Sequence, residues 1–180
     1  MEHKNINKII INKVEYLYDV EQFIYAFVND IDGDEIVHIP AKININNKEL
    51  PVEHLTDHFI HNTVINKRIT KFIVDENNNR LKSINNLLYY IDHYDDFLYS
   101  VAAVPSELKL KEINLPKNIK NVDLSRFNSN NYIKRVYINH DDDFNSDIFC
   151  SYKNKIKYLK EIIINNNLLI KIKNNQLKLY

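Results

Sequence analysis

Three histidines and an aspartate lie close enough together in the sequence to suggest a metal site. His54, His58 and His61, with Asp57 between them, supply the imidazole and carboxylate groups that zinc binds. A spacing of four residues places His54 and His58 on one face if the segment is helical. The glutamate expected beside a paired-histidine hydrolase site is absent. A metal-dependent enzyme with a His54/His58/His61 site is therefore kept as an alternative, while no metal or cofactor is predicted.

A second stretch, Asp30-Ile31-Asp32-Gly33-Asp34, imitates the start of a calcium-binding loop. An EF-hand requires glycine at the sixth loop position and glutamate at the twelfth. Here the sixth residue is Glu35 and the twelfth is Ala41, with the strand-like segment Ile36 to Ile39 between them. We interpret the aspartates as a hairpin turn.

Other catalytic arrangements find little support. The single cysteine, Cys150, has no neighbouring histidine and cannot form an internal disulfide. With Gly33 as the only glycine, P-loop and Rossmann nucleotide sites are excluded, since each needs at least two glycines. We predict that the chain is not an enzyme.

The charges are unevenly distributed although the formal net charge is zero. The last thirty residues carry seven lysines and one glutamate, whereas Asp141, Asp142, Asp143 and Asp147 form an acidic cluster. Clustered lysines can contact phosphates, so a nucleic-acid-binding protein using the basic C-terminal region is an alternative. We favour lysines on the solvated face of a capping structure, because terminal repeats need polar outer faces.

The elements that position these residues are predominantly strands. Val14, Tyr16 and Tyr18 alternate, as do Phe23, Tyr25 and Phe27, which predicts an antiparallel ribbon at the N-terminus with a turn at Asp32-Gly33. The segments 87–91 and 97–101 predict a second hairpin. Since glycine is so scarce and asparagine occurs 28 times, we expect asparagine and aspartate to form the tight turns.

One pattern, apolar-x-x-apolar-x-apolar-x-x-Asn/Asp, occurs four times. Its copies are Ile69, Phe72, Val74 and Asn77; Leu110, Ile113, Leu115 and Asn118; Ile133, Val136, Ile138 and Asp141; and Leu159, Ile162, Ile164 and Asn167. A unit of this form and spacing is typical of leucine-rich repeats, whose stacked coils bury one continuous apolar side. An Asn or Asp after each strand can bond backbone groups at the bend.

These patterns predict a mainly β fold: a short leucine-rich-repeat solenoid with a parallel concave sheet, an N-terminal antiparallel ribbon and an inserted β-hairpin. We expect one domain over 1–180. It divides into a ribbon and degenerate first repeat over 1–60, repeats over 61–170 with the hairpin insertion at 87–101, and a C-terminal cap over 171–180.

The stretch from Phe72 to Ile138 resembles the BspA-like leucine-rich repeats of bacterial and protist surface proteins. The resemblance rests on 75–78, on 81–89, on Ile113-Asn114-Leu115-Pro116, and on Ile119, Val122 and Phe127. A degenerate first repeat is suggested upstream by Val37-His38-Ile39-Pro40, followed by Val52, Leu55 and Phe59. In this repeat the last three residues face the core, so we expect His54, His58 and His61 on the outer curve. Two departures, Asp123 for a glycine and Arg126 for a small residue, put the convex-side turns in doubt. Family members are commonly secreted adhesins.

Residues between the buried positions should point outward on the concave sheet. One predicted row holds Ile73, Asn114, Tyr137 and Ile163, with His38 one coil earlier, and the row beside it holds Lys71, Glu112, Arg135 and Glu161. Aliphatic, aromatic and arginine side chains are typical of protein interfaces. The alternative is an ordinary solvated sheet whose side chains only reflect strand propensity.

We therefore expect a non-catalytic module that binds another protein through this face. Nothing at the N-terminus has the form of a signal peptide and no apolar run has the length of a membrane helix, so a cytoplasmic location without membrane contact is expected. A more specific hypothesis, from small size and AT-rich composition, is a phage or mobile-element inhibitor of a host defence protein. The chain should be a monomer or a weak homodimer.

Overall fold

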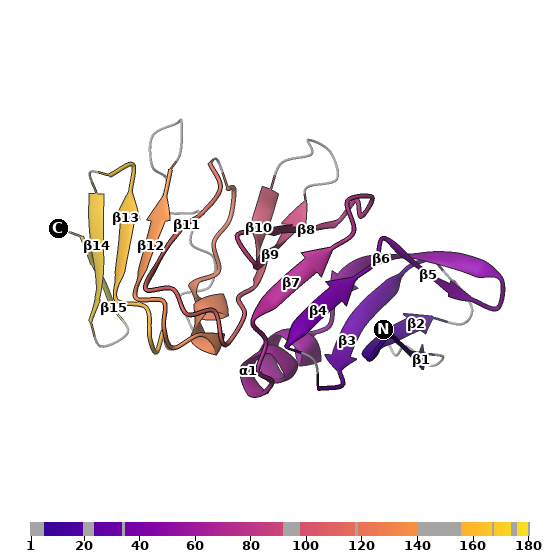
Figure 1. The fold of residues 1–180 in the computed structure, drawn as a ribbon. Coiled ribbons are helices and arrows are strands. Elements are labelled where there is room, and N and C mark those ends of the chain that lie inside the picture. Colours follow the sequence, from indigo (N-terminus) through magenta and orange to yellow (C-terminus); the bar gives the residue numbers. More distant parts are fainter. Residues whose placement is uncertain are drawn as a thin grey trace.

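The computed structural model describes residues 6–19, 24–33, 35–91, 98–117, 119–139, 156–166, 168–173 and 176–179. The predicted Asp141–Asp147 cluster, Cys150, Asn118 and Asn167 fall outside these residues. Strands dominate and follow one another along an elongated molecule from the N-terminal to the C-terminal end (Figure 1). Among the described residues, no helix has the length and apolar character needed to cross a membrane.

The N-terminal end is a five-stranded sheet in the order β1-β2-β3-β6-β5. Its strands are β1 (Ile6–Ile11), β2 (Val14–Asp19), β3 (Ala26–Ile31), β6 (Lys48–Leu55) and β5 (Lys42–Ile45). β1, β2 and β3 pair antiparallel, which confirms the predicted ribbon. The expected hairpin at Asp32-Gly33 is wrong, because β6 occupies the second edge of β3 and leaves no edge for the following strand.

That following strand, β4 (Ile36–Ile39), instead pairs in parallel with β7 (Lys71–Val74). At the other end of the molecule, β11 (Glu112–Asn114), β12 (Arg135–Ile138) and β13 (Glu161–Ile164) form a second parallel group. β14 (Leu168–Lys173) and β15 (Gln176–Leu179) extend this sheet antiparallel. The predicted parallel sheet is therefore divided, because β7 and β11 are not hydrogen-bonded neighbours.

A three-stranded antiparallel sheet, β8 (Leu81–Ile84), β9 (Leu87–Ile91) and β10 (Leu98–Ala103), lies between the two parallel groups (Figure 1). It contains the predicted hairpin. Leu87 and Tyr89 belong to the C-terminal cluster of buried residues, whereas Leu88 belongs to the N-terminal cluster. Burial on both faces explains why this strand is a continuous apolar run without alternation.

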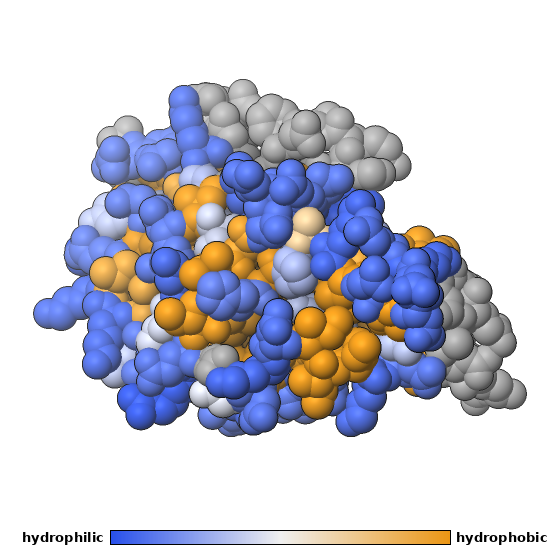
Figure 2. Space-filling model, turned by 45° about the vertical axis from the view of Figure 1, so that its right-hand side comes forward, coloured by the Kyte–Doolittle hydropathy of each residue, from blue (hydrophilic) through white to orange (hydrophobic). Residues whose placement is uncertain are grey.

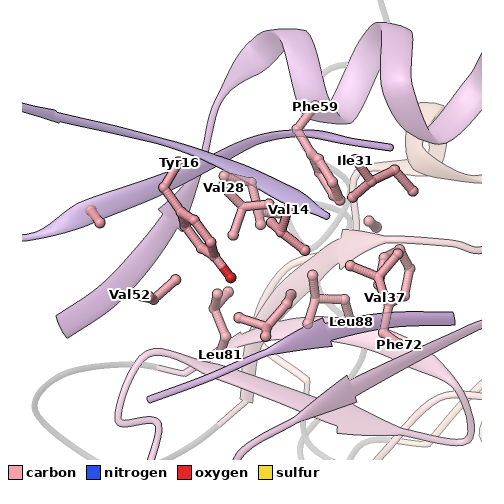
Figure 3. Packing of buried hydrophobic residues seen from close by; sticks show 14 of the residues in the cluster. Val14, Tyr16, Val28, Ile31, Val37, Val52, Phe59, Phe72, Leu81 and Leu88 are labelled. Atoms are coloured by element: carbon pink, nitrogen blue, oxygen red, sulfur yellow. The ribbon is translucent and has the colours of Figure 1, made fainter. Parts of the chain in front are cut away.

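The N-terminal cluster packs one layer of side chains against another. Figure 3 shows Tyr16 and Val28 of the first sheet facing Leu81 and Leu88 across the interior. Phe59 enters from the helical turn η1 (Phe59–Thr63), which continues into α1 (Val64–Asn66). Both clusters contain residues of β9 and β10, and the predicted domain boundaries stay predictions.

The convex turn near residue 125 forms despite the two unusual residues there. Asp123 caps the 3-10 helix η2 (Leu124–Ser129) by accepting a hydrogen bond from the Ser125 amide at 2.9 Å. Arg126 Nε lies 3.2 Å from Asp123 Oδ2, and Phe127 is buried. The two departures from the repeat pattern are thus partners in one ion pair, and Asp123 also caps the helix.

The repeat pattern places its inward residues correctly in nearly every copy. Phe72, Ile113, Val136 and Ile162 are all buried, while Val74 is half-buried. The prediction that Leu110 points inward is wrong, because Leu110 is 42% exposed and Leu108 is buried instead. The Leu110 amide donates to the Leu108 carbonyl at 2.9 Å, and this tight turn directs Leu110 outward.

Asparagine forms the tight turns, as predicted. Asn46, Asn47, Asn85 and Asn86 have φ between 51° and 67° in two-residue hairpin loops. The left-handed region is accessible to asparagine at little penalty, and it suits the twist of flanking strands. The bend asparagine of the first repeat is misplaced by one residue, because Asn77 is exposed and its neighbour Asn78 is buried.

Parallel strands that alternate with convex-side turns and share buried inward positions make this chain a mainly β, leucine-rich-repeat-like solenoid.

Candidate functional site

Six of the eight predicted binding residues lie on one outward surface, here called the C-terminal face. Parallel pairing aligns its residues in two rows across β11, β12 and β13: Glu112, Arg135 and Glu161; and Asn114, Tyr137 and Ile163. The residues between them point into the core, as alternation along a strand requires. Within these three strands, the predicted rows have the predicted register.

An ion network joins the three strands across this face. Arg135 Nε donates to Glu161 Oε2 at 2.8 Å, and Arg135 Nη1 donates to Glu112 Oε1 at 2.5 Å. Hydrogen bonding to Glu161 is the main reason that the pKa of Arg135 is raised above its ordinary value. The hydroxyl of Tyr137 donates to Glu112 Oε2 at 3.2 Å. The polar groups of this surface therefore hold one another in place.

The other two predicted residues lie on a separate surface, here called the N-terminal patch. Lys71 and Ile73 of β7 stand opposite Ile36 and His38 of β4. A hollow of about 280 Å³ borders His38, Ile73 and Asp75. Because the sheet is divided between β7 and β11, the expected continuous row from His38 to Ile163 does not exist.

The histidine cluster is not assembled as a helical pair. His54 lies in β6 and His58 precedes the helical turn η1, so the spacing of four residues does not place them on one face. His58 Nε2 lies 3.8 Å from Asp30 Oδ2. The described residues contain no group of three or more His, Cys, Asp or Glu side chains arranged to hold a metal ion.

His54 instead belongs to an aromatic group that sequence reasoning missed. Its ring centroid lies 5.3 Å from that of Tyr25, 5.6 Å from that of Phe27 and 6.4 Å from that of Tyr90. Burial is the main reason that the pKa of His54 is lowered, which favours the neutral ring. In the sequence, the alternation of Tyr25 and Phe27 indicates that these two rings lie on the same face. The sequence does not show that His54 lies beside them, because His54 is on β6, which pairs in parallel with β3.

A hollow of about 370 Å³ lies beside this group, bordered by Leu17, Tyr18, Tyr25, Phe27 and Leu55. In the view of Figure 2, apolar surface is divided into separate patches by hydrophilic side chains. The described surface thus offers both a mainly apolar hollow and a polar, pre-ordered face. Of the two, the C-terminal face has arginine and tyrosine held in defined positions.

No protein-family model and no curated protein sequence matches the chain. Among solved structures, the pneumococcal vaccine antigen PcpA is 18% identical over 73% of this chain, with a TM-score of 0.48. A leucine-rich cell surface protein from Faecalibacterium prausnitzii A2-165 is 8% identical over 74% of this chain, with a TM-score of 0.35. The chain spans 28% of the first protein and 70% of the second. The BspA-like family is not confirmed, and the leucine-rich-repeat-like fold follows from the strand topology of the chain itself.

Proposed function

We propose that the chain is a non-catalytic module that binds another protein through the C-terminal face. The observation that carries this proposal is the Glu112–Arg135–Glu161 network with Tyr137 hydrogen-bonded beside it. Arginine and tyrosine are the residue types most often responsible for binding energy at protein interfaces. Here both stand on a sheet, half-buried and already oriented.

Pre-ordering favours binding because fewer side chains lose freedom on contact. Immobilising a flexible side chain at an interface costs about 0.5–1.5 kcal/mol. Arg135 is already held by two carboxylates on neighbouring strands, so much of its freedom is lost before a partner arrives. A sheet that reflected strand propensity alone would not need a charged network connecting three strands.

Lys71 and Ile73 remain a proposed extension of this surface on the N-terminal patch. The hollow beside Ile73 could accept one side chain of a large partner. The hypothesis of an inhibitor of a host defence protein gains no support from the fold, and it forms no part of the proposal.

The test is site-specific photo-crosslinking followed by measured affinity. A benzophenone amino acid replaces Tyr137 in one variant and the exposed Tyr158 in another, and both are irradiated in extracts of the source cells. A protein captured at position 137 alone is then purified, and its binding to the unlabelled chain is measured by calorimetry.

Substitution Tyr137→Ala should weaken that binding at least about tenfold, since a central aromatic contributes about 2 kcal/mol or more. Tyr158→Ala is the matched control, because it removes an equally large ring from outside the face. If Tyr137→Ala and Arg135→Glu bind the purified protein as tightly as the unmodified chain, the C-terminal face is not the binding surface.

A further inference from the structure

Five lysines gather along one edge of the C-terminal sheet, at the N-terminal ends of its parallel strands. We call this group the lysine strip; it consists of Lys109, Lys111, Lys134, Lys157 and Lys160. Backbone hydrogen bonds set the spacing of its centre: the Lys134 amide donates to Lys111 O at 2.8 Å, and the Lys160 amide donates to Lys134 O at 2.9 Å. Neighbouring strands lie about 4.8 Å apart, so these three lysines form a row of consecutive positive charges.

The charge of the strip is not neutralised within the part of the chain that the structure describes. None of the five lysines forms an ion pair there. The carboxylates that directly follow two of these lysines, Glu112 after Lys111 and Glu161 after Lys160, are both bound by Arg135 on the C-terminal face. The lysines are exposed except Lys134, which is half-buried. A positive edge therefore exists in a chain whose formal net charge is zero.

An exposed aromatic ring stands within the strip. Tyr158 is 38% exposed, and Lys134 Nζ lies 5.4 Å from the centroid of its ring. The adjoining Lys157 amide donates to Asn128 Oδ1 at 2.8 Å, which fixes the segment that carries the ring. Lysines beside an accessible ring match the two contacts that single-stranded nucleic acids offer, namely phosphates and unpaired bases.

We propose that the lysine strip binds single-stranded nucleic acid, with its lysines on the phosphates and Tyr158 stacked on a base. Duplexes fit less well, because their bases are already stacked and cannot cover the ring. The strip was not evident in the sequence, since three separate segments contribute to it. The basic residues of the C-terminal thirty supply only Lys157 and Lys160 of the five.

The test measures binding of a fluorescein-labelled oligothymidylate of fifteen nucleotides to the full chain at several salt concentrations. Five lysine contacts predict a slope of log Kobs against log[salt] of about −3.5, at about 0.7 per contact. The triple variant Lys111→Ala, Lys134→Ala, Lys160→Ala should reduce the steepness by about 2 and weaken binding about 100-fold near 0.1 M salt.

The matched control, Lys8→Ala, Lys42→Ala, Lys82→Ala, removes three lysines from strands β1, β5 and β8 and should bind as the unmodified chain does. Tyr158→Ala should weaken binding about tenfold without changing the slope, while Tyr158→Phe retains affinity. Tyr137→Ala should leave oligonucleotide binding unchanged, which separates this proposal from the protein-binding face.

Two results would overturn the proposal. One is equal binding by the two triple variants, which means that the strip is not the site. The other is that heparin, at an equal concentration of charge, displaces the oligonucleotide and that Tyr158→Ala does not change oligonucleotide binding. Together these two observations mean that the strip binds any polyanion rather than single-stranded nucleic acid. Circular dichroism and urea unfolding confirm that each variant is folded before binding is measured.

Discussion

Asn130 is completely buried and satisfies four backbone groups with one side chain. Its Nδ2 donates to the carbonyls of Pro105 and Leu108 at 2.7 and 2.9 Å. Its Oδ1 accepts from the amides of Tyr132 and Ile133 at 2.8 and 2.9 Å. We predict that this side chain is among the most sensitive positions for stability, because it links two neighbouring coils through their backbones.

Asn130→Ala removes all four bonds and leaves buried backbone groups unpaired. At about 1 kcal/mol net for each bond, the free energy of unfolding should fall by about 4 kcal/mol. With a urea m-value near 2 kcal/mol per molar, the unfolding midpoint should fall by about 2 M. The adjacent, exposed Asn131→Ala is the matched control and should change stability by less than about 0.5 kcal/mol.

The variant Asn130→Asp tests the direction in which stability changes with pH. It places a carboxylate oxygen against two carbonyl oxygens, which raises the pKa of the new side chain above the unfolded value near 3.9. A raised folded-state pKa makes the variant most stable below that value, with stability lost as the pH rises through the folded-state pKa. The variant should therefore be closer in stability to the unmodified protein at pH 4 than at pH 7. Equal midpoints for Asn130→Ala and Asn131→Ala would refute the reasoning.

Three further predictions concern other buried groups. Tyr89→Phe should leave stability unchanged or raise it by about 1 kcal/mol in urea unfolding, because the Tyr89 hydroxyl is buried and has no hydrogen-bond partner among the residues that the structure describes; a loss above 1 kcal/mol would contradict this. Leu108→Ala should destabilise by about 2–4 kcal/mol and Leu110→Ala by less than 1, which checks by denaturation which leucine fills the core. Although burial opposes ionisation of Asp30, hydrogen bonds from Thr63 and Ile31 hold its pKa below its ordinary value, and the buried Thr63 hydroxyl donates to Asp30 Oδ1 at 2.7 Å, so Thr63→Val should destabilise the protein at pH 7. The depressed pKa makes this contribution present above pH 4 and lost as the pH falls through the folded value, so the difference should shrink towards pH 2.

Several elements were predictable because their signals are local. The alternation of Val14, Tyr16 and Tyr18 identifies β2 and its inward face, since successive side chains on a strand point to opposite sides. Asn46 and Asn85 begin hairpin loops because few residues tolerate the left-handed backbone there. The inward positions of β12 and β13 follow from the repeat pattern for the same local reason.

Other features needed information that a single pattern does not contain. The bend asparagine was misplaced at Asn77, whereas Asn78 is the buried one: it donates to the carbonyls of Pro40 and Val52. A usable signal was present, because Asn78 and Asn130 each lie three residues before a buried apolar residue and each accepts from that residue's amide. The carbonyl groups to which Asn78 and Asn130 donate lie 22 to 38 residues away in the sequence, so the pattern within one repeat does not identify these carbonyls.

The sequence by itself determined most of the inward side chains and the asparagine hairpin loops, because both depend on neighbours within a few residues; Leu110 and the expected turn at Asp32-Gly33 are the exceptions. Only the tertiary structure decided which strands lie side by side. The Arg135 network and the lysine strip join residues 23 to 26 positions apart, and coils of unequal length can stack in more than one register. The division of the parallel sheet is also a tertiary feature. The sheet β8–β10 contributes side chains to both buried clusters and therefore lies between β7 and β11.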